Sequence, residues 1–538
     1  MRTSKASASG NGGGGSAGTA APGLRAGELN LFDETVVAVS SVGPAYSLAA
    51  TLGLLFAAVA YAGPAVLIVS FVPMLFIATA YFYLNQKDPN CGASYAWISR
   101  LVGPDVGWFN GWVQLTASVL FCVAAPLLAG SYTLQFFHSV GWISAATAGE
   151  MWLTSGIAAL WLAGITFITV YGVRWTANAQ WVFLIIQYPV LVGASIWGIA
   201  KVATQHPPGS TRFRWSWLSP LSIHGYQGLA AGMVVGLFLY WGWDTSVNLN
   251  EESKGSTRTP GEACIISMFL LMLLFCLNIV AAQMLIPAKQ LAGQGTNLLF
   301  YFTEQAGGRW LGYLMIFAVL SSTVADTQTT LLPASRLTLS MARDGVFPPA
   351  FRKVHGRFQT PLLGTLILAS LCLFGILLRT VSSAINTGYG NLIEDIGVLV
   401  AFYYGATGVA CAWSYRKVML ANARFFLIGV LLPFLSGAFC FWVGYEVIKQ
   451  SGAAASASVL VAMALGVPLI VVARRTTRSD FFHRRAIAFD SMEPDRPSRP
   501  RHDHPAIPRP AQQRPTGPAP RPQSRRRRPA WRQRRPRP

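Results

Sequence analysis

Long runs of apolar residues, separated by short polar segments, follow one another through most of this chain. A helix that crosses a membrane needs roughly 20 consecutive apolar residues. Twelve runs are long enough and predict twelve transmembrane helices: 34–59, 63–84, 107–136, 152–172, 177–200, 226–249, 263–286, 310–339, 360–379, 392–415, 424–448 and 456–473. The pattern therefore predicts an all-α polytopic membrane protein.

Two of these runs are interrupted by residues that disfavour a helix. The first run contains Ser40-Ser41-Val42-Gly43-Pro44, and the sixth contains Tyr240-Trp241-Gly242-Trp243-Asp244. Proline has no backbone N–H and disfavours helical geometry at the residue before it. In lipid each unpaired backbone group costs several kcal/mol, so a break persists only where protein, water or a ligand pairs those groups. Matched breaks in two halves of a chain indicate a transporter binding site.

The positions of the breaks divide the chain into two halves. Five helices counted from each broken run give repeat one over residues 31–201 and repeat two over 226–415, with two extra helices over 424–474. Because each half holds an odd number of helices, the two halves have opposite orientations in the membrane. We therefore expect a 5+5 inverted repeat with two extra helices inside a transmembrane domain of residues 31–475.

Composition adds a polar tail on each side of this domain. Residues 1–30 are rich in Gly and Ser and predict a flexible tail, and residues 476–538 are rich in Arg and Pro and predict a disordered one. The net charge of +21 sits largely in the second tail. Lys and Arg are also more frequent in one set of short loops, so we expect both termini in the cytoplasm and the protein in the cell membrane.

The basic tail has a second interpretation, which is contact with anionic lipid or nucleic acid. Beyond Phe489 the only aromatic residue of this tail is Trp531, which offers no stacking platform for bases, so no nucleic-acid partner is expected. Signatures of enzymes and of nucleotide-driven pumps, such as HExxH, GxSxG and Walker A, do not occur. We therefore expect neither an enzyme nor a cofactor.

The first break offers hydrogen-bond donors to an anion. Its candidate binding residues are Ser40, Ser41, Val42, Gly43, Pro44 and Ala45. The N–H groups that begin the half-helix after the break, reinforced by the helix dipole, form an anion site that suits a carboxylate. The alternative is a proline-kinked helix without a ligand.

The second break offers acceptors and aromatic rings to a cation. Its candidate residues are Phe238, Tyr240, Trp241, Gly242, Trp243 and Asp244. Asp244 lies within a membrane span, where a carboxylate is costly and therefore a functional candidate. It either receives a substrate ammonium group or holds the half-helix in place through its backbone, and the rings can wall a pocket or make a cation–π contact. Taken together, the two breaks suit a zwitterion, which predicts amino acid transport.

Other polar residues within the spans are candidates for coupling an ion: Gln187, Ser322, Thr323 and Asp326. Hydroxyl groups that face unwound carbonyls of the first helix can coordinate a cation, and a buried Asp326 can carry a proton. The alternative for Asp326 is a structural pair with Arg336 or a Ser/Thr network. No metal site is expected.

Two further features have structural explanations. Glu394 and Asp395 lie near one end of the run 392–415, where a solvated rim is expected. Gly228, Gly232 and Gly236 are spaced four residues apart and line one face of a helix. Small residues at that spacing let two helices approach closely, so we expect internal packing, with dimerisation as the alternative.

Several motifs, in this order, resemble the amino acid permeases of the amino acid–polyamine–organocation (APC) superfamily. They are Leu31-Phe32-Asp33-Glu34, Ala62-Gly63-Pro64 and the residues to Phe71, Pro89-x-x-Gly92-Ala93-Ser94-Tyr95 with Gly111-Trp112, Tyr240-x-Gly242-Trp243-Asp244 with Glu251-Glu252, and Arg336 with Met341-Ala342-Arg343-Asp344-Gly345-x-x-Pro348. The resemblance implies a LeuT-type fold and uptake or exchange of amino acids by alternating access. It also implies that backbone at 41–45 takes the substrate α-carboxylate, that carbonyls at 240–243 take the α-amine, and that Phe238 is an aromatic gate.

The chain departs from this family pattern at three places. Its first break lacks the usual Gly-Ser-Gly type of sequence, Gln187 stands where some members carry a lysine that replaces a sodium ion, and Asp326 is not a usual family feature. The coupling ion, a proton or sodium, and the choice between symport and antiport therefore stay open. Rival interpretations are a polyamine or organocation permease, a transporter-like sensor that signals through the basic tail, and, third, a membrane-embedded enzyme.

Overall fold

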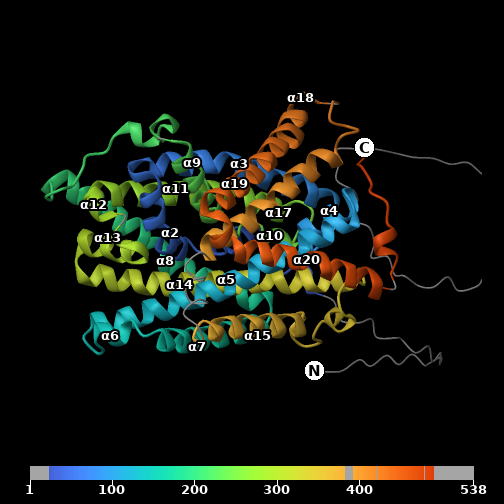
Figure 1. Ribbon diagram of the computed structural model, residues 1–538, viewed down its shortest axis with the longest axis horizontal. Coiled ribbons are helices and arrows are strands. Elements are labelled where there is room, and N and C mark those ends of the chain that lie inside the picture. Colours follow the sequence, from blue (N-terminus) through green and yellow to red (C-terminus); the bar gives the residue numbers. More distant parts are fainter. Residues whose placement is uncertain are drawn as a thin grey trace, which may run out of the picture. The chain divides into compact units, whose positions relative to one another are not determined.

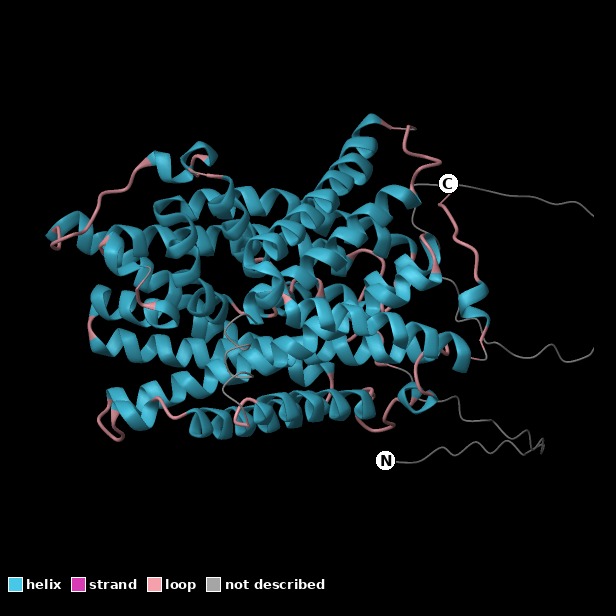
Figure 2. Ribbon diagram, viewed as in Figure 1, coloured by secondary structure: helices cyan, strands magenta, loops and turns pink. Residues whose placement is uncertain are grey.

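The computed structural model describes residues 24–223, 225–291, 293–381, 392–420, 422–477 and 479–489. Within these residues the chain is built from helices joined by turns and loops, with no extended strand among them (Figure 2). Residues 1–23 and 490–538, which make up most of the two predicted tails, lie outside the described residues.

The helices are named in chain order. Those of the first half are α1 (Leu31–Ser40), α2 (Pro44–Val59), α3 (Gly63–Lys87), α4 (Ala93–Leu101), α5 (Pro104–Ser139), α6 (Ala145–Ala148), α7 (Met151–Val170) and α8 (Val173–Gln205). Those that follow are α9 (Tyr226–Leu239), α10 (Thr245–Asn248), α11 (Thr259–Leu285), α12 (Ala288–Leu291), α13 (Leu298–Gly307), α14 (Arg309–Arg343), α15 (Leu362–Leu378), α17 (Leu392–Ser414), α18 (Ala423–Phe425), α19 (Leu432–Ala455) and α20 (Ala457–Thr476).

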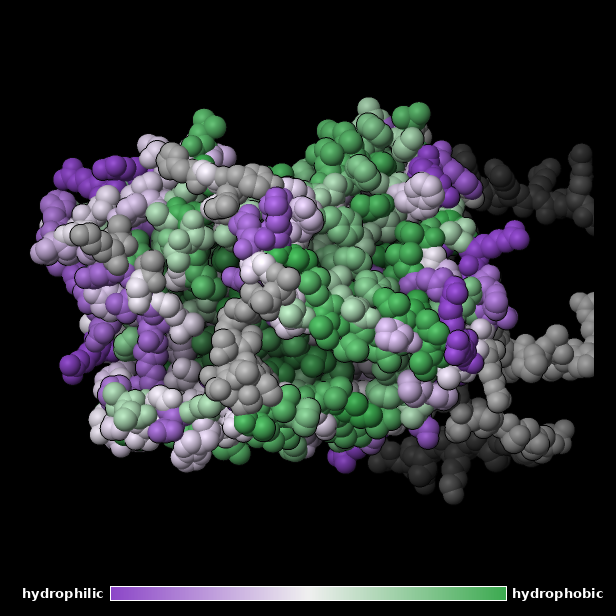
Figure 3. Space-filling model, viewed as in Figure 1, coloured by the Kyte–Doolittle hydropathy of each residue, from purple (hydrophilic) through white to green (hydrophobic). Residues whose placement is uncertain are grey.

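Each of the twelve apolar runs is helical over most of its length. Nine helical runs among the described residues are long and apolar enough to cross a membrane, and α9 and α15 contain shorter apolar helices. Figure 3 shows hydrophobic residues over the middle of the helical body and hydrophilic residues gathered toward its two ends. This distribution is that of a polytopic membrane protein, because lipid can cover the apolar middle while water solvates the ends.

Both predicted breaks occur in the structure. The chain leaves the helix between α1 and α2 and again between α9 and α10. The helix after the second break is short, as the run 226–249 predicted: α10 ends at Asn248, and a 3₁₀ turn over Asn250–Glu252 follows. There the Asn250 amide donates to the Asn85 side chain of α3 over 2.7 Å, so this residue bonds to a neighbouring helix instead of continuing its own.

Local sequence explains how the first broken helix starts. The Asn30 side chain accepts the N–H groups of Phe32 and Asp33, and the Asp33 side chain in turn accepts the Asn30 N–H. This reciprocal capping box satisfies donors that no helical carbonyl can reach. It fixes the point at which α1 begins.

The helices pack so that both broken segments are interior. In Figure 1, α5 and α14 are long neighbouring helices, with α7 and α15 beside them, and α2, α3, α9 and α11 form another group of neighbours. The glycine face of α9 packs against α2 and α3: an ideal Cβ on Gly232 would lie 2.9 Å from a Val59 methyl, and one on Gly236 would lie 2.0 Å from the Ser70 hydroxyl oxygen. The prediction of internal packing for this face is confirmed.

One expectation about a polar residue was wrong, and two short helices were not predicted. Asp395 was predicted at a solvated rim, but it is buried and accepts a 2.5 Å hydrogen bond from the Ser458 hydroxyl, because α20 covers this end of α17. The helices α4 and α13 were not predicted at all, since both are short and interrupted by polar residues. The Tyr95 and Phe302 side chains are nevertheless buried, so tertiary packing supports both helices.

Candidate functional site

The first break turns on a residue that must be glycine. Gly43 has a φ of 55°, a left-handed conformation that residues with a Cβ rarely adopt. An ideal Cβ at this position would lie 2.4 Å from the Asp326 Oδ2 atom of α14. Pro44 follows as the first residue of α2, where its missing N–H costs nothing. The turn therefore brings the start of α2 directly against α14.

The second break contains a glycine that meets the first break. Gly242 has a φ of 120°, and its Cβ, if present, would lie 2.2 Å from the Ser41 carbonyl oxygen and 3.2 Å from the Val42 nitrogen. The two broken segments, 200 residues apart in sequence, are therefore in backbone contact. Only a residue without a side chain permits so close an approach.

Hydroxyl groups join the two breaks to α14. The Ser41 hydroxyl donates to the Thr245 hydroxyl over 2.6 Å, and the Thr245 hydroxyl donates to the Thr329 carbonyl over 3.2 Å. The Tyr46 N–H, one of the first amides of α2, donates to the Ser322 hydroxyl over 3.0 Å. Backbone and side-chain groups from three separate segments thus converge on one buried point.

One backbone N–H group at the N-terminal end of α2 has no hydrogen-bond partner among the described residues. Among the described residues the Ala45 N–H has no hydrogen-bond acceptor, and the buried Ser40 hydroxyl, before the turn, also lacks a partner. An unpaired amide at a helix start is the group that an anion needs. The chain therefore leaves a free donor where the sequence predicted an anion site.

The aromatic residues of the second break point to two different places. Trp241 packs edge-on against Phe121 of α5, with ring centroids 5.2 Å apart, and its indole N–H donates to the Tyr403 hydroxyl. Phe238 lies beside Trp241, at 6.2 Å. Tyr46 packs on the other side of Phe121, at 5.3 Å. These rings form a wall that contains two of the predicted aromatic residues.

The other two predicted aromatic residues face away from this wall. Trp243 stacks on Tyr404 of α17, with ring centroids 5.1 Å apart, and meets Tyr81 of α3 edge-on. Tyr240 directs its hydroxyl to the Leu67 carbonyl over 3.3 Å. Their packing ties the second break to α3 and α17, which is a supporting role.

Asp244 lies immediately before α10 and is buried. Its Oδ1 atom accepts a 2.8 Å hydrogen bond from the Tyr404 hydroxyl, and its carbonyl accepts one from the Asn248 amide over 2.9 Å. No basic side chain pairs with this carboxylate among the described residues. Its contacts hold the end of the break against α17 and α10.

Asp326 has a different neighbourhood from the one first considered. It is buried beside Gly43, and its side-chain hydrogen-bond partner is Thr330, one turn along α14. The predicted alternative of a pair with Arg336 was wrong, because Arg336 binds Glu252 instead. A carboxyl group therefore lies against the turn of the first break, and among the described residues its partner is the Thr330 hydroxyl and not a guanidinium.

The remaining coupling candidates separate into near and distant ones. Ser322 reaches the first break, as its bond to Tyr46 shows, whereas the Thr323 hydroxyl donates to the Val319 carbonyl of its own helix over 2.8 Å. Gln187 of α8 is 1% exposed, and neither its amide nitrogen nor its oxygen has a partner among the described residues. This buried, unsatisfied amide is unusual, because most buried polar groups find a partner.

Several residues at this point were missed from sequence. They are Phe121, Thr245, Thr329, Tyr403 and Tyr404. A signal existed for two of them, since adjacent tyrosines in an apolar run need partners for their hydroxyls. Glu34 was also missed as a contact: its carboxylate accepts from the Ser246 hydroxyl over 2.6 Å and from Ser253, which binds α1 to the segment after the second break.

A cavity of about 500 Å³ reaches the aromatic wall from the end of the bundle opposite to the start of α1. Tyr46 and Ala50 of α2 and Ala124, Leu127 and Leu128 of α5 are among its lining residues. Arg379 and Thr296 add polar groups to the lining. Tyr46 thus belongs both to the wall of rings and to the lining of this cavity.

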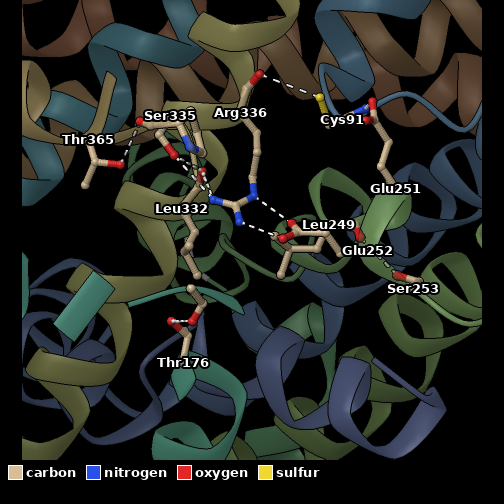
Figure 4. Close-up of polar contacts among 12 residues, drawn as sticks. Cys91, Thr176, Leu249, Glu251, Glu252, Ser253, Leu332, Ser335, Arg336 and Thr365 are labelled. Atoms are coloured by element: carbon tan, nitrogen blue, oxygen red, sulfur yellow. Dashed lines mark hydrogen bonds and ion pairs between the residues drawn. The ribbon is translucent and has the colours of Figure 1, made fainter. Parts of the chain in front are cut away.

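At the other end, which we call the α1 end, a buried ion pair holds the segments together. Figure 4 shows the Arg336 guanidinium directed at Glu252, where Nε donates to Oε2 over 2.9 Å and Nη2 donates to Oε1 over 3.1 Å. Both side chains are 1% exposed. Nearby, Arg343 pairs with Glu251 at 2.9 Å, and Glu251 also accepts the Cys91 N–H. These contacts bind α14 and the loop before α4 to the residues that follow the second break.

Replacing Glu252 by Gln should destabilise the protein strongly. The variant leaves Arg336 buried without a countercharge, a loss of about 3 to 5 kcal/mol. The measurement is the fraction of detergent-solubilised protein that stays monodisperse on heating. Glu262→Gln is the matched control, because its partner Arg258 is 71% exposed and such pairs contribute less than about 1 kcal/mol. Equal losses in the two variants would contradict a dominant role for the buried pair.

Comparison with known proteins adds an independent observation. A family profile described as amino acid permease matches residues 29–473. The chain is 23% identical over 335 residues to the vacuolar cationic amino acid transporter 4 of Arabidopsis thaliana, which covers 60% of this chain and 52% of that protein. It is 25% identical over 374 residues to the methylthioribose transporter of Bacillus subtilis, a match that covers 68% of this chain and 76% of that protein. It is 23% identical over 321 residues to the low-affinity putrescine importer PlaP of Escherichia coli, a match that covers 58% of this chain and 66% of that protein.

The chain spans about half the length of the Arabidopsis relative and more of the two bacterial ones. These relatives are all named as transporters or importers. The family match runs from just before α1 to near the end of α20 and thus includes both breaks. It confirms the resemblance that the sequence motifs suggested, and the chain belongs to the amino acid permease family of the APC superfamily.

Proposed function

We propose that this chain is a secondary-active permease that carries amino acids across the cytoplasmic membrane by alternating access. The observation that carries the proposal is the backbone contact of Gly242 with Ser41. It brings the N–H end of α2 next to the carbonyl end of α9. Every amino acid has a carboxylate that suits the first end and an ammonium group that suits the second.

Backbone groups supply the common part of this recognition. The unpaired Ala45 N–H supports an α-carboxylate bound within residues 40–45, and carbonyls within 240–243 take the α-amine. The wall that contains Phe238 and Trp241 meets the 500 Å³ cavity at Tyr46. It acts as the aromatic gate, because a substrate that enters from the cavity must pass these rings.

The architecture we propose is a LeuT-type 5+5 inverted repeat with twelve transmembrane helices. Repeat one covers residues 31–201, repeat two covers 226–415, and the extra helices cover 424–474. The breaks at the first helix of each half support this division. In this arrangement both termini are cytoplasmic and the α1 end faces the cytoplasm, where its ion pairs keep it closed while the cavity at the opposite end admits substrate.

A proton is the coupling ion that we favour. Asp326 is a buried carboxyl group in contact with the turn at Gly43, so its charge acts directly on the start of α2. Gln187 cannot supply a charge where other permeases have a lysine. Ser322 and Thr323 are less suited to a sodium site, since the first already bonds to Tyr46 and the second to its own helix.

A second candidate function is a permease for polyamines or other organocations. The observation that favours it is the position of Asp326, whose carboxyl group lies where a substrate carboxylate would bind. With Asp244 it gives two buried carboxyl groups that no basic side chain pairs among the described residues. An amine without a carboxylate would complement them.

A radiolabelled uptake panel in proteoliposomes distinguishes these candidates. We expect uptake of at least one amino acid, stimulated by an inward proton gradient and unaffected by a sodium gradient of the same size. The panel includes neutral, cationic and acidic amino acids together with putrescine. Uptake of putrescine and of no amino acid would replace the first candidate with the second, and dependence on sodium would exclude proton coupling.

Gly43→Leu should reduce uptake by about a hundredfold or more, because a side chain at this position collides with Asp326 and displaces the start of α2. The measurement is the initial rate of uptake, normalised to the amount of inserted protein. Gly141→Leu is the matched control: Gly141 also has a positive φ, of 81°, but its Cβ would meet no atom within 4 Å. Normal kinetics in Gly43→Leu would remove the first break from the binding site.

Asp326→Asn should abolish the pH dependence of net uptake but leave exchange of internal for external substrate. The amide keeps the shape of the carboxyl group and cannot exchange a proton. Uptake and exchange are compared at external pH values from about 5 to about 8. Asp395→Asn serves as control, because Asp395 is also buried and hydroxyl-bonded but contacts α20. Unchanged pH dependence in Asp326→Asn would leave this residue with a structural role.

A further inference from the structure

After α20 the chain continues across the α1 end of the bundle. We call residues 479–489 the strap. It contacts the end of α14, the helix α4, and the ends of α3 and α17. No part of the proposed transport site lies in it, and it belongs to neither repeat.

The first part of the strap and the helix α4 both bind Asp344, the C-cap residue of α14. The Ser479 hydroxyl donates to the Asp344 carbonyl over 2.8 Å, and Arg484 pairs with the Asp344 Oδ1 atom at 2.7 Å. The other carboxylate oxygen, Oδ2, accepts the Tyr95 hydroxyl over 3.0 Å. Phe481 is fully buried, and its ring stacks on Tyr95 with centroids 6.2 Å apart and an interplanar angle of 12°. The strap therefore completes a cluster that joins two helices.

The last part of the strap binds three further elements. The Ile487 N–H donates to the Arg100 carbonyl of α4, and the Phe489 N–H donates to the Ser414 carbonyl of α17, both over 3.0 Å. The Phe489 ring packs against Tyr415 at 5.0 Å and lies 5.7 Å from the Lys87 ammonium group at the end of α3. The backbone bonds fix the path of the strap whatever its side chains are.

The elements under the strap come from both halves of the chain. Helices α3 and α4 belong to the first half, and α14 and α17 to the second. Any motion that separates the halves at the α1 end must break strap contacts. The buried Phe481 ring contributes most to this attachment, because the Arg484–Asp344 pair is partly exposed and such pairs contribute little.

We propose that the strap is a latch, which holds the α1 end closed and must detach before that end opens. Its link to transport rests on the proposed function, in which the α1 end is the cytoplasmic gate. The latch itself is a property of the fold and can be measured without a substrate. It gives the residues after α20 direct control over how often the bundle opens.

A native cysteine in the loop before α4, close to the end of α14 that the strap binds, reports opening. Cys91 is fully buried at the α1 end, with its sulfur 3.7 Å from the Arg336 carbonyl oxygen of α14 and 3.6 Å from an Arg343 guanidinium nitrogen. Burial, with a further contribution from the adjacent Glu251 carboxylate, raises the pKa of this thiol well above its ordinary value. Because the thiolate is the reactive form, Cys91 can be alkylated only when the α1 end opens to water.

The test is the rate at which N-ethylmaleimide alkylates Cys91 in the full-length chain, read by mass spectrometry of the peptide. Phe481→Ala should raise this rate about tenfold, which corresponds to about 1.4 kcal/mol. Arg485→Ala is the matched control, because Arg485 is exposed and the structure gives it no ion pair. An unchanged rate in Phe481→Ala would overturn the proposal.

Two further measurements separate release of the latch from general unfolding. Cys122, buried in α5 beside the Thr327 carbonyl, should stay unreactive in the variant. Equal acceleration at Cys122 and Cys91 would overturn the proposal. If Phe481→Ala does not fold, the double variant S479A/R484A replaces it, because this variant removes the strap's side-chain contacts to Asp344 and keeps the buried ring. It should raise the Cys91 rate by a smaller factor than Phe481→Ala. No increase in this rate would also overturn the latch. The Cys91 rate is measured without a substrate, so an unchanged rate overturns the latch alone, whereas absence of uptake by the unmodified chain would overturn the proposed function alone.

Discussion

The structure depends on one close approach between two backbones. Gly242 lies against the Ser41 carbonyl at a separation that no other residue allows. Because the contact lies in the interior of a membrane protein, each backbone group freed by the two breaks needs a partner from the protein. The breaks are therefore stable only together, each supplying part of the environment that the other needs, and the surrounding helices are arranged around this pair.

Interactions of different strength surround this contact. Around the breaks the partners are hydroxyl groups, namely those of Ser41, Thr245 and Ser322, and a single neutral hydrogen bond contributes only about 0.5–1.5 kcal/mol net. At the α1 end the bidentate Arg336–Glu252 pair is much harder to break, because separation would leave a buried charge. The protein thus combines a centre held by weak bonds with one end held by a strong one.

The apolar pattern was sufficient to predict the helices and both breaks, because lipid requires long helices and tolerates few interruptions. It also predicted that α9 packs through its glycines. It did not predict α4 and α13, which depend on tertiary packing. Residue types alone cannot show which side of a helix faces inward.

That limitation explains the errors at the candidate site. Asp326 and Arg336 share α14, and a pair between them was reasonable from spacing, but Arg336 points toward Glu252 of another segment. The aromatic residues near Gly242 were all candidates, yet Trp241 lies in the wall beside the cavity and Trp243 packs toward α3 and α17. Such distinctions require the positions of neighbouring helices, which one sequence does not contain.

The contact between Gly242 and Ser41 also separates what evolution can vary from what it cannot. Its geometry is made by main-chain atoms, so it does not depend on which side chains lie nearby, whereas any side chain placed at Gly242 would collide with the Ser41 carbonyl. In a permease the main chain can then recognise the groups that all substrates share. Under the proposed function, discrimination between substrates falls to side chains such as Phe121, Tyr403 and Trp241, because these can be exchanged one at a time without changing the main-chain contact.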